Sequence, residues 1–110
     1  MVKNLTFTYD ALNDLFYAYK KGSNVYSNLM IGKFHLEMNQ TGDIVGIEVL
    51  HASDILNDYK IPKKMLEQLK SVSLKVVQRD NSLIAFLGFH TAKEEKTATI
   101  TMGESLLAAT

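Results

Sequence analysis

The sequence predicts an α+β domain rich in β-strand: an antiparallel meander of about five strands, one helix and a C-terminal antiparallel strand unit. Apolar and polar residues alternate with a period of two over several short stretches, which is typical of half-buried strands. Turn-forming residues such as Asn, Asp and Gly separate these stretches. The single proline, Pro62, opens the one stretch whose apolar residues have a helical period.

Length and composition indicate one globular domain over residues 1–110. We expect the meander in residues 1–51, a helical connection in residues 52–71 and the C-terminal strands in residues 72–103. Apolar residues make up 46% of the chain and charged residues 22%, a balance typical of a folded protein. The absence of cysteine excludes disulfides and thiol catalysis.

The first predicted hairpin begins with alternating residues 5–10. Residues 10–13 have the composition of a tight turn, in which Asn13 can adopt a left-handed conformation. The return strand then covers residues 14–20 and gives one apolar face rich in tyrosine. The predicted cross-strand pairs are Tyr9 with Leu15, Phe7 with Tyr17 and Leu5 with Tyr19.

A third strand is expected at residues 25–31, followed by a hairpin of residues 34–38 and 44–50. Asn39 and Gly42 fit a type I turn that ends in a left-handed residue. Side chains directly across such a pair share a face, so Glu48 is predicted to lie among apolar residues. The expected pairs are Met38 with Ile44, Leu36 with Gly46 and Phe34 with Glu48.

The second half of the chain begins with Ser53, a plausible N-cap for a short turn. A helix is predicted over residues 62–70, laid on the sheet. Strands are then expected at residues 72–79 and 83–89, joined by a two-residue loop, and at residues 97–102, which have the alternation of an edge strand.

Four segments of the chain resemble the DUF2283 family of short prokaryotic domains: Tyr9-Asp10, Asp14-Leu15-Phe16-Tyr17, residues 42–50, and Ala52-Ser53. The family pattern has a Tyr-Asp…Asp-x-Leu-Tyr start and a Gly-x-Ile-Val-Gly-Ile-Glu-Ile-Leu-x-Ala-Ser core. Residues 61–89 are similar to the extension of longer archaeal members. Residues 10–14 and 37–39 are less acidic than in many members, which argues against a carboxylate metal loop. The resemblance implies a fold and no activity.

Glu48 is the main candidate for chemistry. A carboxylate shielded from water binds a proton more readily and could act as a general acid or base. A structural role, at the rim of the sheet or bonded to a tyrosine hydroxyl, is the competing interpretation. Tyr17, His35 and His51 are candidate binding residues around it.

Other functional classes lack a signal. No histidine spacing is typical of a metal site, and no glycine-rich loop indicates a phosphate-bearing cofactor, so we expect neither a metal nor a cofactor. Twelve basic and twelve acidic residues cancel, which argues against nucleic acid. No apolar run could span a membrane, and the first residues lack a signal-peptide core, so we expect a cytoplasmic protein.

Two function classes remain open. The first is a non-catalytic module that binds a protein partner or assembles with itself, as a homodimer or higher homo-oligomer. By resemblance its partner role would be antitoxin-like, because some relatives are encoded beside small toxin-like proteins. The alternative is a small ligand-binding protein or enzyme that uses Glu48 with a tyrosine or histidine as acid and base. The absence of a catalytic constellation favours the first class.

Overall fold

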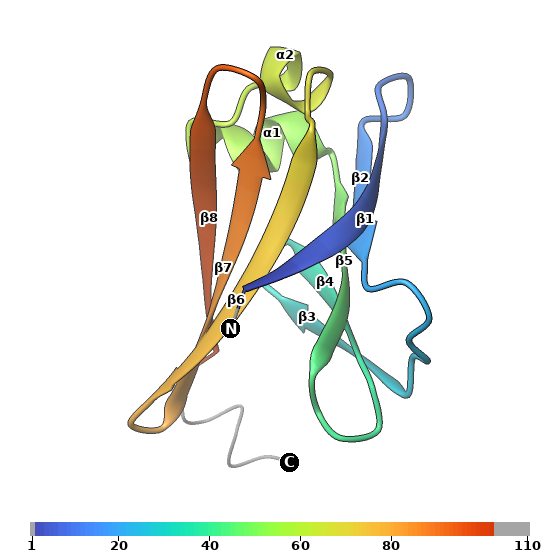
Figure 1. Ribbon diagram of the computed structural model, residues 1–110, viewed down its shortest axis with the longest axis vertical. Helices are drawn as coiled ribbons and strands as arrows, with labels where there is room; N and C mark the ends of the chain where they lie inside the picture. Colours follow the sequence, from blue (N-terminus) through green and yellow to red (C-terminus); the bar gives the residue numbers. More distant parts are fainter. Residues whose placement is uncertain (1, 103–110) are drawn as a thin grey trace.

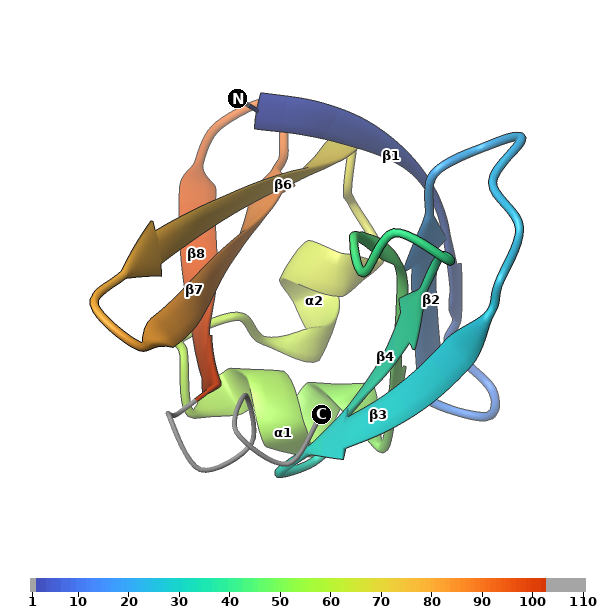
Figure 2. The same ribbon diagram turned by 90° about the horizontal axis from the view of Figure 1, so that it is seen from below.

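A single curled antiparallel sheet of eight strands forms most of the protein (Figure 1). The computed structural model describes residues 2–102. The spatial order is β3-β4-β5-β2-β1-β6-β7-β8, and two short helices, α1 (Ala52–Asn57) and α2 (Lys63–Leu66), lie at one end of the curl (Figure 2). The strands are β1 Val2–Asp10, β2 Leu15–Tyr19, β3 Ser27–Ile31, β4 Phe34–Met38, β5 Ile44–Leu50, β6 Ser71–Arg79, β7 Ser82–His90 and β8 Glu95–Met102.

Strand β1 joins the two halves of the sheet. Residues 2–5 pair with β6, and residues 6–10 pair with β2. Because strand twist accumulates along such a sheet, one long strand with two partners lets the halves curl around a common interior. The β-rich, antiparallel class is confirmed, but the meander and the C-terminal unit form one sheet. Residue 103, the last of the predicted C-terminal unit, lies outside the described residues.

The order of the first five strands differs from the predicted meander. β2 pairs with β5, whereas a meander would place it beside β3. β5 is buried along most of its length and suits the interior of the sheet, while the largely exposed β3 suits an edge. The chain between β2 and β3 makes this crossing, and the Lys20 amide there donates to the Val45 carbonyl at 2.8 Å.

The β1–β2 hairpin closes one residue later than predicted. Asp14, rather than Asn13, has the left-handed conformation, with φ of 52°, so the loop holds four residues. Tyr9 then pairs with Phe16, which is fully buried in the core. The predicted pairs of Tyr9 with Leu15, Phe7 with Tyr17 and Leu5 with Tyr19 are therefore wrong.

The β4–β5 loop has the predicted form. Gly42 has φ of 87°, a value that costs a glycine little, and the Asn39 amide donates to the Asp43 carbonyl at 3.0 Å. Met38 pairs with Ile44, which confirms the register next to the turn.

A β-bulge at Val45 then shifts the pairing by one residue. Glu37 pairs with Gly46 and His35 with Glu48, so Val45 has no partner on β4. The predicted pairs of Leu36 with Gly46 and Phe34 with Glu48 are wrong for this reason. The shifted register buries Ile47 and Val49 completely and turns Glu48 to the outer face, which avoids shielding a carboxylate from water.

The core lies inside the curl. Phe16 and Phe89, from opposite halves of the sheet, are fully buried with ring centroids 5.2 Å apart. The helical connection closes one end of the interior with Leu56, Ile61 and Leu66, which are buried. The curled sheet thus covers its own apolar inner face.

Helix α2 is shorter than the predicted helix over residues 62–70. It ends at the C-cap Glu67, and the Lys70 amide already donates to the His90 carbonyl, which starts the pairing of β6 with β7. The helical connection itself is present, since α1 and α2 both lie between β5 and β6. In the described part of the chain, no helix is long and apolar enough to cross a membrane.

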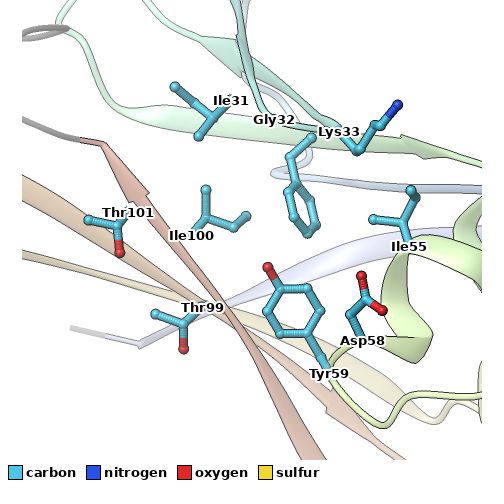
Figure 3. A pocket seen from close by; sticks show the side chains of 10 residues that line it. Ile31, Gly32, Lys33, Ile55, Asp58, Tyr59, Thr99, Ile100 and Thr101 are labelled. Atoms are coloured by element: carbon cyan, nitrogen blue, oxygen red, sulfur yellow. The ribbon is translucent and has the colours of Figure 1, made fainter.

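The free edges of the sheet, β3 and β8, approach each other beside α1. Phe34 and Tyr59 meet edge to face there, with ring centroids 6.0 Å apart. Figure 3 shows Tyr59 and Ile100 at a hollow of about 250 Å³ between the two edges. The predicted edge strand over residues 97–102 is confirmed as part of β8.

The Asp14 carboxylate ties the β1–β2 turn to the start of α1. It accepts hydrogen bonds from the Tyr9 hydroxyl at 2.5 Å, the Ser53 hydroxyl at 2.7 Å and the Ser53 amide at 3.0 Å. The Asp14 carbonyl also accepts from the Ala52 amide at 2.9 Å. Asp14, which lies in a distant loop, therefore accepts hydrogen bonds from the backbone amides at the start of α1. The N-cap residue by backbone position is His51 and not Ser53 as predicted.

These contacts alter the acid–base behaviour of the network. Burial opposes the ionisation of Asp14, but the hydrogen bonds from Tyr9 and Ser53 and the charge of Lys63 outweigh it and lower the pKa of the carboxyl. Burial, followed by the hydrogen bond to Asp14, raises the pKa of Tyr9. Asp14 is consequently an anion held by donors at neutral pH.

We expect Asp14→Asn to lower the free energy of unfolding at neutral pH by about 1–3 kcal/mol, because the donors then face a weaker, neutral acceptor. The folded-state pKa of Asp14 is lowered. Its contribution is thus present above the unfolded-state pKa of about 3.9 and is lost as the pH falls through the folded-state value. Chemical denaturation over the acid range should show the stabilities of the two proteins converging.

The matched control is Asp80→Asn, at an exposed turn residue that also has φ of 52°. Its free energy of unfolding should change by no more than about 0.5 kcal/mol. An equal loss in both variants would show that the backbone conformation, and not the hydrogen bonds of Asp14, is responsible.

Candidate functional site on the outer face of the sheet

Polar side chains gather on the outer face of β3, β4, β5 and β2. The pairing aligns Met30, His35, Glu48 and Tyr17 in one row across these strands. A second row, one pleat away, runs through Asn28, Glu37, Gly46 and Tyr19. We call the set of Tyr17, Tyr19, Asn28, His35, Glu37 and Glu48 the outer cluster.

The members of the outer cluster bind one another. The Tyr17 hydroxyl donates to Glu37 Oε1 at 2.5 Å. His35 Nδ1 lies 3.5 Å from Glu48 Oε1, and His35 Nε2 lies 3.0 Å from Asn28 Oδ1. The rings of Tyr17 and Tyr19 stack with centroids 5.1 Å apart. The contacts thus form two neighbouring groups on one surface, one around Tyr17 and one around His35.

Gly46 provides the space for the group around Tyr17. It lies on β5 between Glu37 on β4 and Tyr19 on β2. A Cβ at this position would collide with Glu37 Oε1, the atom that accepts from Tyr17. The absence of a side chain thus allows the carboxylate of Glu37 to lie across β5 and reach the hydroxyl on β2.

The electrostatics make Tyr17 a proton donor. Burial, then the hydrogen bond to Glu37, and then the charges of Glu37 and Glu48 raise the pKa of Tyr17 to about 12. At neutral pH the phenol keeps its proton and points it at a carboxylate. Tyr17 is consequently unsuited to act as a general base or nucleophile.

Glu48 does not have the environment expected of a buried acid or base. Its side chain keeps 35% of its surface exposed, beside His35. The expectation of a largely buried Glu48 is wrong because the bulge at Val45 moves the residue to the outer face. Over residues 2–102, the hollows of about 250–450 Å³ are lined by residues other than Glu48.

The structure brings three of the four predicted site residues together. Tyr17, His35 and Glu48 are in the outer cluster, whereas His51 is exposed at the start of α1, with φ of 53°. Glu37 was missed, although a glycine in a strand, Gly46, is a sequence signal for the close approach of a neighbouring group. Among residues 2–102, no three His, Asp or Glu side chains converge as metal ligands would.

The fold and the outer cluster define a small curled-sheet domain with a polar and aromatic outer face. Residues 6–53 match the model of the DUF2283 family, proteins of unknown function, so the family resemblance is confirmed over this region. An uncharacterised protein of the archaeon Methanocaldococcus jannaschii is 33% identical over 61 residues, which cover 54% of this chain. The chain spans about half, 53%, of that relative. No solved structure matches the chain.

We expect Glu37→Gln to lower the pKa of Tyr17 from about 12 toward its ordinary value, because the mutation removes a negative charge beside the phenol. Burial, the largest cause, remains, so the pKa should stay above that of a free tyrosine. Phenolate absorbance during an alkaline titration measures the change, and Tyr17→Phe identifies the transition.

The same pair affects alkaline stability. Because the folded-state pKa of Tyr17 is raised, its contribution is fully present below the unfolded-state value of about 10 and is lost as the pH rises toward the folded-state value. Tyr17→Phe should therefore reduce the loss of stability over this range. An unchanged alkaline profile in Tyr17→Phe would contradict the raised pKa of Tyr17.

Proposed function

We propose that this protein is a binding module whose outer cluster is non-catalytic and recognises protein, first of all a second copy of the same chain. The observation that carries the proposal is the composition of the outer face beside the open edge β3. Ordered tyrosines and polar groups lie there next to exposed apolar side chains, a mixture typical of protein interfaces.

The exposed apolar side chains gather around β3. Val25, Tyr26 and Met30 are exposed, with Tyr26 exposing 71% of its surface and Met30 exposing 60%. Met30 lies in the same row as His35 and Glu48. An interface that covered this edge would bury apolar area next to hydrogen-bonding groups that already hold their conformations, which lowers the entropy cost of binding.

A second copy is the simplest occupant of this edge. β3 has a strand neighbour on one side only, and antiparallel pairing with another β3 would extend the sheet about a two-fold axis. The other edge, β8, offers the route through residues 97–102. Its outer face carries Thr97, Thr99 and Thr101, which provide less apolar area, so we favour β3.

Self-assembly is not needed to cover the inner strand faces. Strands that are apolar on both sides need another chain only where the sheet does not close on itself. The curl covers the inner faces of β2, β5 and β7, so the remaining apolar area is that of the outer face and the edge.

A different protein could occupy the same surface. In an antitoxin-like role, the outer cluster and β3 would bind to the surface of a partner protein. Isolating the protein from its host together with the proteins bound to it would identify that partner. The alternative function, a ligand binder or enzyme that uses Glu48, has less support, because Glu48 is paired with His35 on an open surface.

We expect the protein to sediment at micromolar concentration as a dimer of 12.3 kDa chains. Met30→Glu should weaken that dimer at least about tenfold, because it places a charge in the interface, on the outer face that also carries Glu37 and Glu48. Since Met30 is exposed, the thermal stability of the monomer should not change.

Leu12→Glu is the matched control, because Leu12 is even more exposed, at 93%, but lies in the β1–β2 turn. It should leave the mass unchanged. A wild-type mass of one chain would reject self-assembly, and equal dissociation by both variants would reject β3 as the interface.

A further inference from the structure

A second cluster of reactive side chains lies on the outer face of the other half of the sheet, on β6, β7 and β8. Ser73 Oγ lies 3.1 Å from His90 Nε2. The other ring nitrogen, His90 Nδ1, lies 3.8 Å from Glu95 Oε2. A hydroxyl, an imidazole and a carboxylate are thus arranged in series, as in enzymes that use serine as a nucleophile.

The contact depends on Gly88. This residue pairs with Ser73 on one side and Thr97 on the other, in the middle of β7. A Cβ at position 88 would lie 2.5 Å from Ser73 Oγ and 3.0 Å from His90 Nε2. The bare backbone therefore leaves the space in which the hydroxyl and the imidazole meet.

The two contacts of His90 fit the tautomer that a general base for Ser73 requires. Ser73 Oγ can donate to Nε2 only if that nitrogen has no proton, which leaves the proton on Nδ1. The Nδ1 side faces Glu95, which favours a proton there and stabilises the positive charge that forms when Nε2 is protonated. The imidazole is oriented as a base for Ser73.

The same three strands and β1 border an open hollow of about 350 Å³ over this cluster. Phe86 and Val2 provide its apolar walls. Asn4 is the cross-strand neighbour of Ser73, and Lys75 follows two residues later on the same face of β6. An amide and an ammonium group therefore line the same hollow as the hydroxyl.

We propose that Ser73, His90 and Glu95 form an acyl-transfer site that hydrolyses small carboxylic esters, with Ser73 as nucleophile and His90 as general base. Glu95 is a positioning residue that acts through His90. The site is separate from the outer cluster, and its existence does not depend on the proposed protein-binding function.

The reaction is balanced with water as the only co-reactant. Ser73 Oγ attacks the ester carbonyl carbon while its proton passes to His90 Nε2, and Asn4 and Lys75 stabilise the resulting oxyanion. The bond between carbon and the leaving oxygen breaks, and His90 gives its proton to the alcohol. Water then attacks the acyl-serine, again losing a proton to His90, which returns it to Ser73 as the acid is released.

The first experiment measures hydrolysis of p-nitrophenyl acetate by the full chain, together with the covalent mass added by a fluorophosphonate. We expect saturable hydrolysis and one label, located on Ser73 by peptide mapping. Ser73→Ala and His90→Gln should each lower kcat/KM at least about tenfold. Ser82→Ala changes a serine at the far end of β7, outside this hollow, and should leave kcat/KM within about twofold.

Two further variants separate chemistry from folding. Gly88→Ala keeps all three reactive side chains but displaces the Ser73 hydroxyl, so kcat should fall while the circular dichroism spectrum is retained. Glu95→Gln should lower kcat with little change in KM, because the carboxylate that positions the imidazole is replaced by a neutral amide. A purely structural role of Glu95 would leave kcat of the folded variant unchanged.

Two results would reject Ser73 as the nucleophile. Hydrolysis that persists in folded Ser73→Ala, or that is lost only when His35 or His51 is replaced, would assign the reaction to a surface imidazole. A fluorophosphonate that labels no serine, or labels Ser71 as readily as Ser73, would likewise reject Ser73 as the nucleophile.

Discussion

The hydrogen bonds of the Asp14 carboxylate are the constraint on which the rest of the sheet depends. They hold the β1–β2 turn at four residues, so they decide which side chains of β2 face the core. They also hold the start of α1, where β5 ends and the chain turns over the interior. One half-buried anion with three donors therefore ties the β1–β2 turn to the start of α1, because each alternative register would leave donors without their acceptor.

Short-range patterns in the sequence correctly predict those elements that depend only on neighbouring residues. The turn at residues 39–42 and the strands around residues 72–79, 83–89 and 97–102 follow their turn chemistry and alternation. The two registers that failed are set by distant groups: Ser53 holds Asp14, and Lys20 binds the bulged Val45. Each error is a single residue, which is enough to turn a strand over.

The candidate site shows the effect of those two errors together. Tyr17 and Glu48 were each assigned to an inner apolar face, and each belongs outside, so the structure brings them together as neighbours on adjacent strands. Glu37 joined them only through the shifted pairing with Gly46. In both halves of the sheet a glycine opposite a polar side chain makes room for contacts that periodicity cannot predict, at Gly46 and at Gly88.

Because β1 belongs to both halves of the sheet, the region that matches the family depends on the rest of the chain. Residues 6–53 carry the family match, but the start of β1 pairs with β6, and Phe16 packs on Phe89 from β7. The segment that matches the family thus shares its sheet and its core with the second half of the chain. A chain reduced to that segment would present an unpaired edge and half a core, and would need complementation by strands from outside itself.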